Sequence, residues 1–179
     1  PRTLSLGLYG DLDVSTIDEL PPGRKSVRTT LSTEQDAYAL IRREVSKKRQ
    51  AYVVFPLVDE SDKVELKAAI REFERLKKDF FPDISVGLLH GQLNSAQKEK
   101  AMKDFCAGEY SILAATTVIE VGIDVPNATV MVVQNADRFG LATLHQLRGR
   151  VGRGKEDSYC VLVADPRTDG AKERLRVLT

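Results

Sequence analysis

The chain has 179 residues, of which 42% are hydrophobic and 30% charged, proportions typical of a globular domain and not of a disordered chain. Its formal net charge is +1, so any affinity for nucleic acid has to come from a local basic patch. No apolar run approaches the length of a membrane span, which excludes insertion into a membrane.

The cysteine and histidine content argues against disulfides and against a bound metal. Cys106 and Cys160 lie far apart, and neither His90 nor His145 stands at a metal-ligand spacing. We expect no metal site and expect both cysteines to fill the core. The sequence shows no signal peptide, so a reducing cytoplasm is the expected location. It also begins at Pro1 and not at a methionine, so we expect a fragment of a longer protein.

The order of apolar runs and amphipathic segments predicts the fold class. Residues 1–25 are expected to be a connector, because acidic residues, prolines and a glycine interrupt a short apolar run, and one domain is expected over 26–179. In that domain, apolar runs typical of buried strands alternate with segments typical of helices. Strands are predicted at 27–31, 51–58, 84–89, 111–115, 129–134 and 158–164, and helices after a cap at Ser32 or Thr33 and at 65–81, 95–107, 141–147 and 170–178.

Such alternation predicts an α/β fold with a mostly parallel sheet covered by helices on both faces. Ligands of such folds gather at the carboxyl ends of the strands. We therefore expect His90, Gly91, Thr116, Thr117 and the turn that follows them to share one edge of the sheet.

The stretch from Gln146 to Gly154 contains three arginines interleaved with three glycines. Guanidinium groups suit phosphate oxygens and stay charged at any relevant pH, and glycines let the backbone approach a ligand closely. The pattern predicts a site for a phosphorylated ligand. A solvated basic turn is the alternative.

No complete P-loop accompanies these arginines. Gly23-Arg24-Lys25-Ser26 resembles the end of one, but Arg24 interrupts the motif and the required upstream glycine is missing. Asp59 and Glu60 follow an apolar run that Pro56 interrupts, so we interpret them as a solvated turn. Arginines without a P-loop predict an arginine finger, which is presented to a γ-phosphate held by a second domain.

The segment from Thr116 to Pro126 suits a sugar-phosphate backbone, because it places hydroxyl groups and amides at a strand end. Gly122 permits a tight turn, and Asp124 can accept a hydrogen bond from a ribose hydroxyl. Ordinary turn or capping roles for the two threonines are the alternative.

Two of these segments, Thr116 to Pro126 and Gln146 to Arg153, resemble motifs V and VI of superfamily 2 helicases in order and spacing. A wider set of segments is similar to the RecG family of bacterial ATP-dependent DNA helicases: 8–15, 18–24, His90-Gly91, 137–140 and 144–154.

The resemblance implies that residues 26–179 form the second RecA-like lobe of a helicase motor, and that residues 1–25 are the end of motif III and the connector between lobes. It implies ATP with Mg²⁺, bound mainly by a first lobe outside this sequence. It also implies branched DNA as a partner, together with the first lobe and the wedge domain of the same polypeptide.

The resemblance further assigns roles to individual residues. Arg153, the preferred finger, and Arg150 are expected at the γ-phosphate, with Gln146, Gly122 and Asp124 at the nucleotide and Thr116, Thr117, His90 and Gly91 at the DNA strand. Two alternatives remain. One is the corresponding lobe of the transcription–repair coupling factor, although the segment Tyr9 to Asp13 favours RecG. The other is a non-catalytic nucleic-acid-binding module with a helicase-like lobe.

Overall fold

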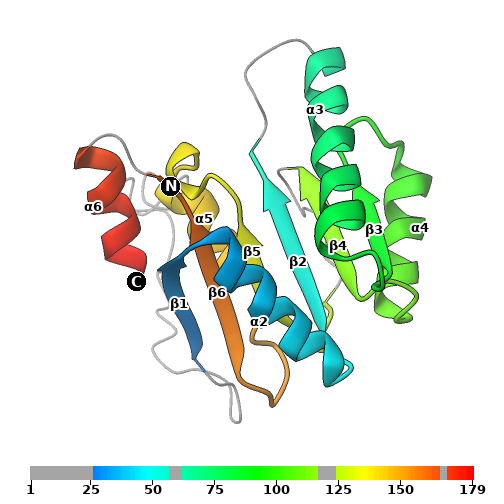
Figure 1. Cartoon of the computed structure of the whole chain (residues 1–179), viewed down its shortest axis with the longest axis horizontal. Helices are drawn as coiled ribbons and strands as arrows, with labels where there is room; N and C mark the ends of the chain where they lie inside the picture. Colours follow the sequence, from blue (N-terminus) through cyan, green and yellow to red (C-terminus); the bar gives the residue numbers. More distant parts are fainter. Residues whose placement is uncertain (1–25, 57–61, 117–123, 166–168) are drawn as a thin grey trace, which may run out of the picture.

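The computed structural model describes residues 26–56, 62–116, 124–165 and 169–179. Six strands form one sheet, in which every neighbouring pair is parallel and the order is β1-β6-β5-β2-β4-β3 (Figure 1). The strands are β1 (Val27–Ser32), β2 (Gln50–Phe55), β3 (Val86–Leu89), β4 (Ile112–Thr116), β5 (Ala128–Val133) and β6 (Ser158–Val163). The predicted parallel sheet is confirmed.

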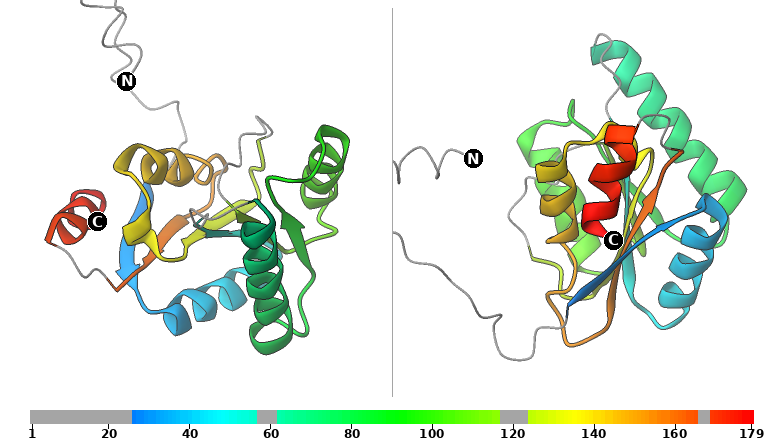
Figure 2. Two further views of the ribbon diagram at one scale, coloured as in Figure 1. Left: turned by 90° about the horizontal axis from the view of Figure 1, so that it is seen from above. Right: turned by 90° about the vertical axis from the view of Figure 1, so that its left-hand side faces the viewer.

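Helices cover both faces of this sheet (Figure 2). The core on one face contains side chains of α2 (Glu34–Ser46) and of the segment that follows α3 (Asp62–Arg75). The core on the other face contains side chains of α4 (Ser95–Cys106), α5 (Leu141–Arg148) and α6 (Asp169–Leu178). Successive residues of β2 alternate between these cores, with Tyr52 in one and Val53 in the other. A strand buried on both faces needs such a continuous apolar run.

Capping groups define the ends of two helices, and the first cap is one of the two residues predicted for it. The Thr33 hydroxyl accepts a hydrogen bond of 3.2 Å from the backbone N–H of Asp36 and so caps α2. Asn94 and Gln97 form a reciprocal capping box at the start of α4. Gly108, at φ +84°, follows the carboxyl end of α4 in a conformation that glycine adopts readily.

Several boundaries differ from the prediction. Strand β2 ends at Phe55, one residue before Pro56, because proline cannot donate to a ladder of hydrogen bonds. The predicted helix over 65–81 is α3 followed by a π-helical segment, η1 (Leu76–Phe80). A 3₁₀ turn, η2 (Ala136–Arg138), was not predicted. Cys160 is buried as expected, but Cys106 is exposed at the end of α4, so its prediction as a core residue was wrong.

The connector predicted over residues 1–25 lies outside the described residues. No helix of the described part is both long and apolar enough to cross a membrane.

Candidate functional site

The arginine loop, which we define as residues 149–154, begins where α5 ends. The N–H groups of Gly149 and Arg150 donate hydrogen bonds to the carbonyl oxygens of His145 and Leu147, at 3.1 and 3.0 Å, and so extend the helical turn. Val151 is then fully buried, and Gly152 reverses the chain at φ +77°. A buried anchor followed by a glycine reversal therefore directs Arg153 outward, where it is exposed, whereas Arg150 is half-buried.

Arg153 has two contacts within the described residues. Its Nε donates a hydrogen bond of 3.2 Å to the carbonyl oxygen of Gly149 and lies 3.5 Å from Oδ1 of Asp124. The side chains of Arg153 and Asp124 keep 37% and 51% of their surfaces exposed. Ion pairs this accessible contribute about 0–1 kcal/mol, so a phosphate can displace the carboxylate from the guanidinium.

Gly154 holds the loop against the segment that contains Asp124. A Cβ atom at this position would lie 2.6 Å from the carbonyl oxygen of Pro126, closer than such atoms approach. Pro126 stands two residues before β5, so this contact locates the loop near the amino end of that strand. Glycine is therefore required at position 154 because the backbone there lies close to the backbone of Pro126.

Burial raises the pKa of the Tyr52 phenol, and the charges of Arg150, Asp124 and Arg153 also act on it. Of these charged groups, Arg153 and Asp124 also contact each other directly.

Two residues predicted at the DNA strand lie at the opposite end of the sheet. Thr116 is the last residue of β4 and is buried, and His90 directly follows β3. Strands β3 and β4 pair in parallel with Leu89 beside Ala115, so the two residues are neighbours across the ladder. Gly91 follows, exposed, with open space around its Cα.

The ring of His90 is half-buried. Burial, and then the charge of Lys98, lowers the pKa of His90 below its ordinary value. Its buried Nδ1 has no hydrogen-bond partner among the described residues.

The residues that were expected to share one edge of the sheet therefore lie at two separate places. Thr116 and His90 do lie at the carboxyl edge, but Asp124 stands close to the amino end of β5, because a connection between parallel strands has to return along the sheet. Gln146 is exposed on α5, in a shallow groove shared with Val177 and Leu178 of α6. Thr117 and Gly122 lie outside the described residues.

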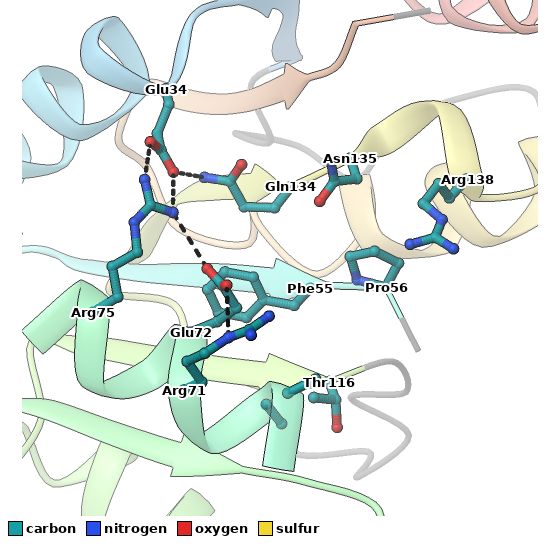
Figure 3. Close-up of a pocket in the computed structure, with 12 residues that line it drawn as sticks. Glu34, Phe55, Pro56, Arg71, Glu72, Arg75, Thr116, Gln134, Asn135 and Arg138 are labelled. Atoms are coloured by element: carbon teal, nitrogen blue, oxygen red, sulfur yellow. Dashed lines mark hydrogen bonds and ion pairs between the residues drawn. The ribbon is translucent and has the colours of Figure 1, made fainter. Parts of the chain in front are cut away.

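A cavity of about 320 Å³ at the carboxyl edge was missed by the sequence reasoning (Figure 3). Arg75 of α3 lies at one side of it, donating to Glu34 at 2.7 Å and to Glu72 at 3.3 Å. The amide of Gln134 donates to the hydroxyl of Tyr38 at 2.8 Å beneath them. Two of its lining residues, Thr116 and Arg138, lie in segments that the sequence analysis had singled out, but the cavity itself was not predicted, because its lining comes from elements far apart in the chain.

Among the described residues, no group of three or more histidine, cysteine or acidic side chains is placed to hold a metal ion. The cationic side chains of the arginine loop suit the phosphates of ATP, and a magnesium ion would need carboxylates from elsewhere.

An all-parallel six-stranded sheet with helices on both faces and an arginine–glycine loop after α5 defines a RecA-like lobe of a helicase motor. The family model "Helicase conserved C-terminal domain" matches residues 34–155, and the chain belongs to this family.

Similarity to RecG, predicted from the motifs, is confirmed. The chain is 54% identical to the ATP-dependent DNA helicase RecG of Synechocystis sp. and 52% identical to that of Thermotoga maritima, covering 99% and 100% of this chain but only 22% and 23% of those proteins. A structure of RecG bound to a three-way DNA junction matches 99% of this chain and 23% of its own, with 49% identity and a TM-score of 0.81. S. cerevisiae Dbp5 L327V bound to RNA and ADP BeF3, at 19% identity and a TM-score of 0.62 over 99% of this chain and 44% of its own, shares the fold.

Proposed function

We propose that this chain is the second motor lobe of a RecG-type, ATP-dependent DNA helicase that acts on branched DNA such as replication forks and Holliday junctions. The observation that carries the proposal is sequence identity of 52–54% to two RecG helicases over 99–100% of the chain. Because the chain spans less than a quarter of these relatives, the helicase activity is assigned to a longer protein, of which this lobe supplies a part.

In this proposal the lobe completes an ATP site that a first lobe begins. Closure of the two lobes around ATP and Mg²⁺ brings Arg153 and Arg150 to the γ-phosphate, where their charge stabilises the transition state of phosphoryl transfer. Asp124 then accepts a hydrogen bond from the nucleotide ribose, with Gln146 and Gly122 nearby. The exposed, weakly held position of Arg153 supports this role, because the guanidinium is free to change partner.

The other end of the sheet contacts DNA in the same proposal. Thr116 and Thr117 donate hydroxyl hydrogen bonds to strand phosphates, and Gly91 beside His90 lets the strand approach the backbone. Reopening of the lobes after hydrolysis shifts this grip along the strand. The remaining partners are the first lobe and the wedge domain of the same polypeptide, in a bacterial cytoplasm.

The test is strand separation by a full-length protein that contains this lobe. With ATP and Mg²⁺ and without RNA polymerase, we expect it to unwind a synthetic three-way junction and to hydrolyse ATP faster when the junction is present. A control duplex of the same length without a branch should be a poor substrate. ATP hydrolysis that no DNA stimulates, with no unwinding of any branched substrate, would contradict the proposal.

A further inference from the structure

The cavity at the carboxyl edge combines an apolar floor with polar walls. Phe55 and Pro56 at the end of β2 and Ala69 of α3 supply apolar surface, and Thr116, Gln134 and Asn135 supply polar groups from the ends of β4 and β5. Three arginines, Arg71, Arg75 and Arg138, line it together with two glutamates, Glu34 and Glu72. The lining therefore has an excess of positive charge.

That charge is unevenly distributed. Arg75 lies between the two glutamates, and its pKa is raised by its hydrogen bond to Glu34, so both carboxylates at this end are occupied. Figure 3 shows this cluster on one side and Arg138 with Asn135 on the other. Within the described residues the Arg138 guanidinium has neither an ion pair nor a hydrogen bond. The Arg138 end thus presents an uncompensated cation.

Backbone contacts fix the position of Arg138. Asn135 adopts the left-handed conformation at φ 47°, and its carbonyl oxygen accepts a hydrogen bond of 2.9 Å from the N–H of Arg138. Arg174 of α6 donates to the carbonyl oxygen of Asp137 at 3.0 Å. A left-handed asparagine costs little but is uncommon, and such conformations gather at ligand sites. The turn η2 therefore holds Arg138 at the cavity by its backbone, and the side chain is exposed.

Arg138 and the arginine loop serve different ligands. Arg138 follows the carboxyl end of β5, whereas Gly154 contacts Pro126 before its amino end. A strand of six residues spans about 20 Å, so a single nucleotide at the loop does not reach Arg138. The distance instead suits a strand that crosses the carboxyl edge while ATP occupies the other end.

We infer that Arg138, with the Asn135 amide beside it, binds one backbone phosphate of a single DNA strand. The inference rests on the proposed function, in which Thr116 already faces DNA, and adds a cation at a position outside the motif V and VI segments. A guanidinium opposite a phosphate, with neutral donors around it, is a common arrangement in backbone recognition. The contact is independent of sequence, because no base edge is involved.

The experiment measures binding of a fluorescent single-stranded oligonucleotide to the full-length protein as a function of salt. Each phosphate contact to a single strand contributes about 0.7 to the slope of log K against log [salt]. We expect Arg138→Ala to lower that slope by about 0.7 and to weaken binding about fivefold at 0.1 M salt for every sequence tested. Arg138→Lys should keep the slope. Arg28→Ala, which removes another exposed charge, from the edge strand β1, is the matched control and should bind as wild type.

A second measurement locates the contacted phosphate in the DNA. In a series of three-way junctions, whose branch fixes the register of the protein, each with one neutral methylphosphonate linkage, Arg138→Ala should be insensitive to one of the linkages at which wild type loses about fivefold affinity. Equal melting temperatures of wild type and Arg138→Ala would show that the variant folds.

Two outcomes distinguish a failure of this inference from a failure of the proposed function. If Arg138→Ala matches Arg28→Ala in slope and affinity while wild type binds the strand and unwinds junctions, the inference fails and the proposed function stands. If wild type neither binds a strand nor unwinds a junction, both fail.

Discussion

Arg153 is paired with Asp124 in this lobe, with Nε of the arginine 3.5 Å from Oδ1 of the aspartate. Both residues are proposed to meet the same nucleotide, one at its γ-phosphate and the other at its ribose. Because the pair is largely exposed, it contributes about 0–1 kcal/mol, which is small against a guanidinium–phosphate contact in a closed site. The pair therefore keeps the finger near its position of action without holding it there.

Replacement of Arg153 should affect the chemical step. In the full-length protein we expect Arg153→Ala to lower kcat for ATP by about 10³–10⁵, the range found for arginine fingers, with a small change in KM. Arg153→Lys should recover only part of this loss, because lysine lacks the planar fork. Steady-state ATPase assays with saturating DNA measure both constants, and Arg28→Ala is the control. Unchanged ATPase activity of the Arg153→Ala protein would show that Arg153 is not the arginine finger.

The variant Asp124→Asn distinguishes two possible roles of Asp124, which are binding of the ribose and positioning of Arg153. If Asp124 binds the ribose, this variant should raise KM for ATP more than it lowers kcat. A variant that instead loses kcat to the extent of Arg153→Ala, with KM unchanged, would make Asp124 a positioning residue for the finger.

Gly154→Ala should destabilise the lobe. A Cβ atom there would lie 2.6 Å from the Pro126 carbonyl oxygen, and backbone on both sides of the contact has to move to relieve the clash. We expect a cost of about 1–3 kcal/mol in the free energy of unfolding, measured by urea denaturation of the 179-residue chain.

The matched control for that variant is Gly170→Ala. Gly170 is a residue of α6 with open space around its Cα, and alanine in a helix is favoured over glycine by roughly 0.5–1 kcal/mol. The same substitution should therefore stabilise the chain at position 170 and destabilise it at position 154. Equal effects at the two glycines would contradict the close approach of the loop to Pro126.

How far sequence predicted this structure depends on the range of the interactions involved. The apolar runs of β2, β4 and β5 and the cap at Ser32 or Thr33 are local signals, and the sequence predicted these elements, with differences only at their boundaries. The pairing of Arg153 with Asp124 joins residues that are 29 positions apart in the chain. It follows from the close packing of Gly154 on Pro126. No local pattern encodes that contact.

The cavity shows the same limit more strongly. Its lining joins Glu34, Arg75 and Arg138, which come from three elements that become neighbours only through the strand order β5-β2-β4. Charged residues such as Glu34 and Arg75 look in sequence like ordinary solvated helix positions. Their pairing across 41 residues becomes visible only when the helices are packed on the sheet.

Glu44 should make the stability of the lobe depend on acid pH. Its carboxylate is buried and accepts hydrogen bonds from Lys47 at 2.9 Å and Arg49 at 2.8 Å, while Arg49 also pairs with Glu156 ahead of β6. Burial acts to raise the pKa of Glu44, but the hydrogen bonds from Lys47 and Arg49 outweigh it, so the pKa lies below its ordinary value.

A carboxyl whose pKa is lower in the folded than in the unfolded state stabilises the fold above the unfolded pKa, about 4.3, and loses that contribution as the pH falls through the folded pKa. Glu44→Gln keeps the size but removes the charge, so we expect it to cost about 1–3 kcal/mol at pH 7 and progressively less below pH 4. Urea denaturation at a series of pH values measures this, with Glu173→Gln on the exposed face of α6 as control. A cost for Glu44→Gln that stays constant from pH 7 to pH 3 would show that the charge of the Glu44 carboxylate does not contribute to the stability of the fold.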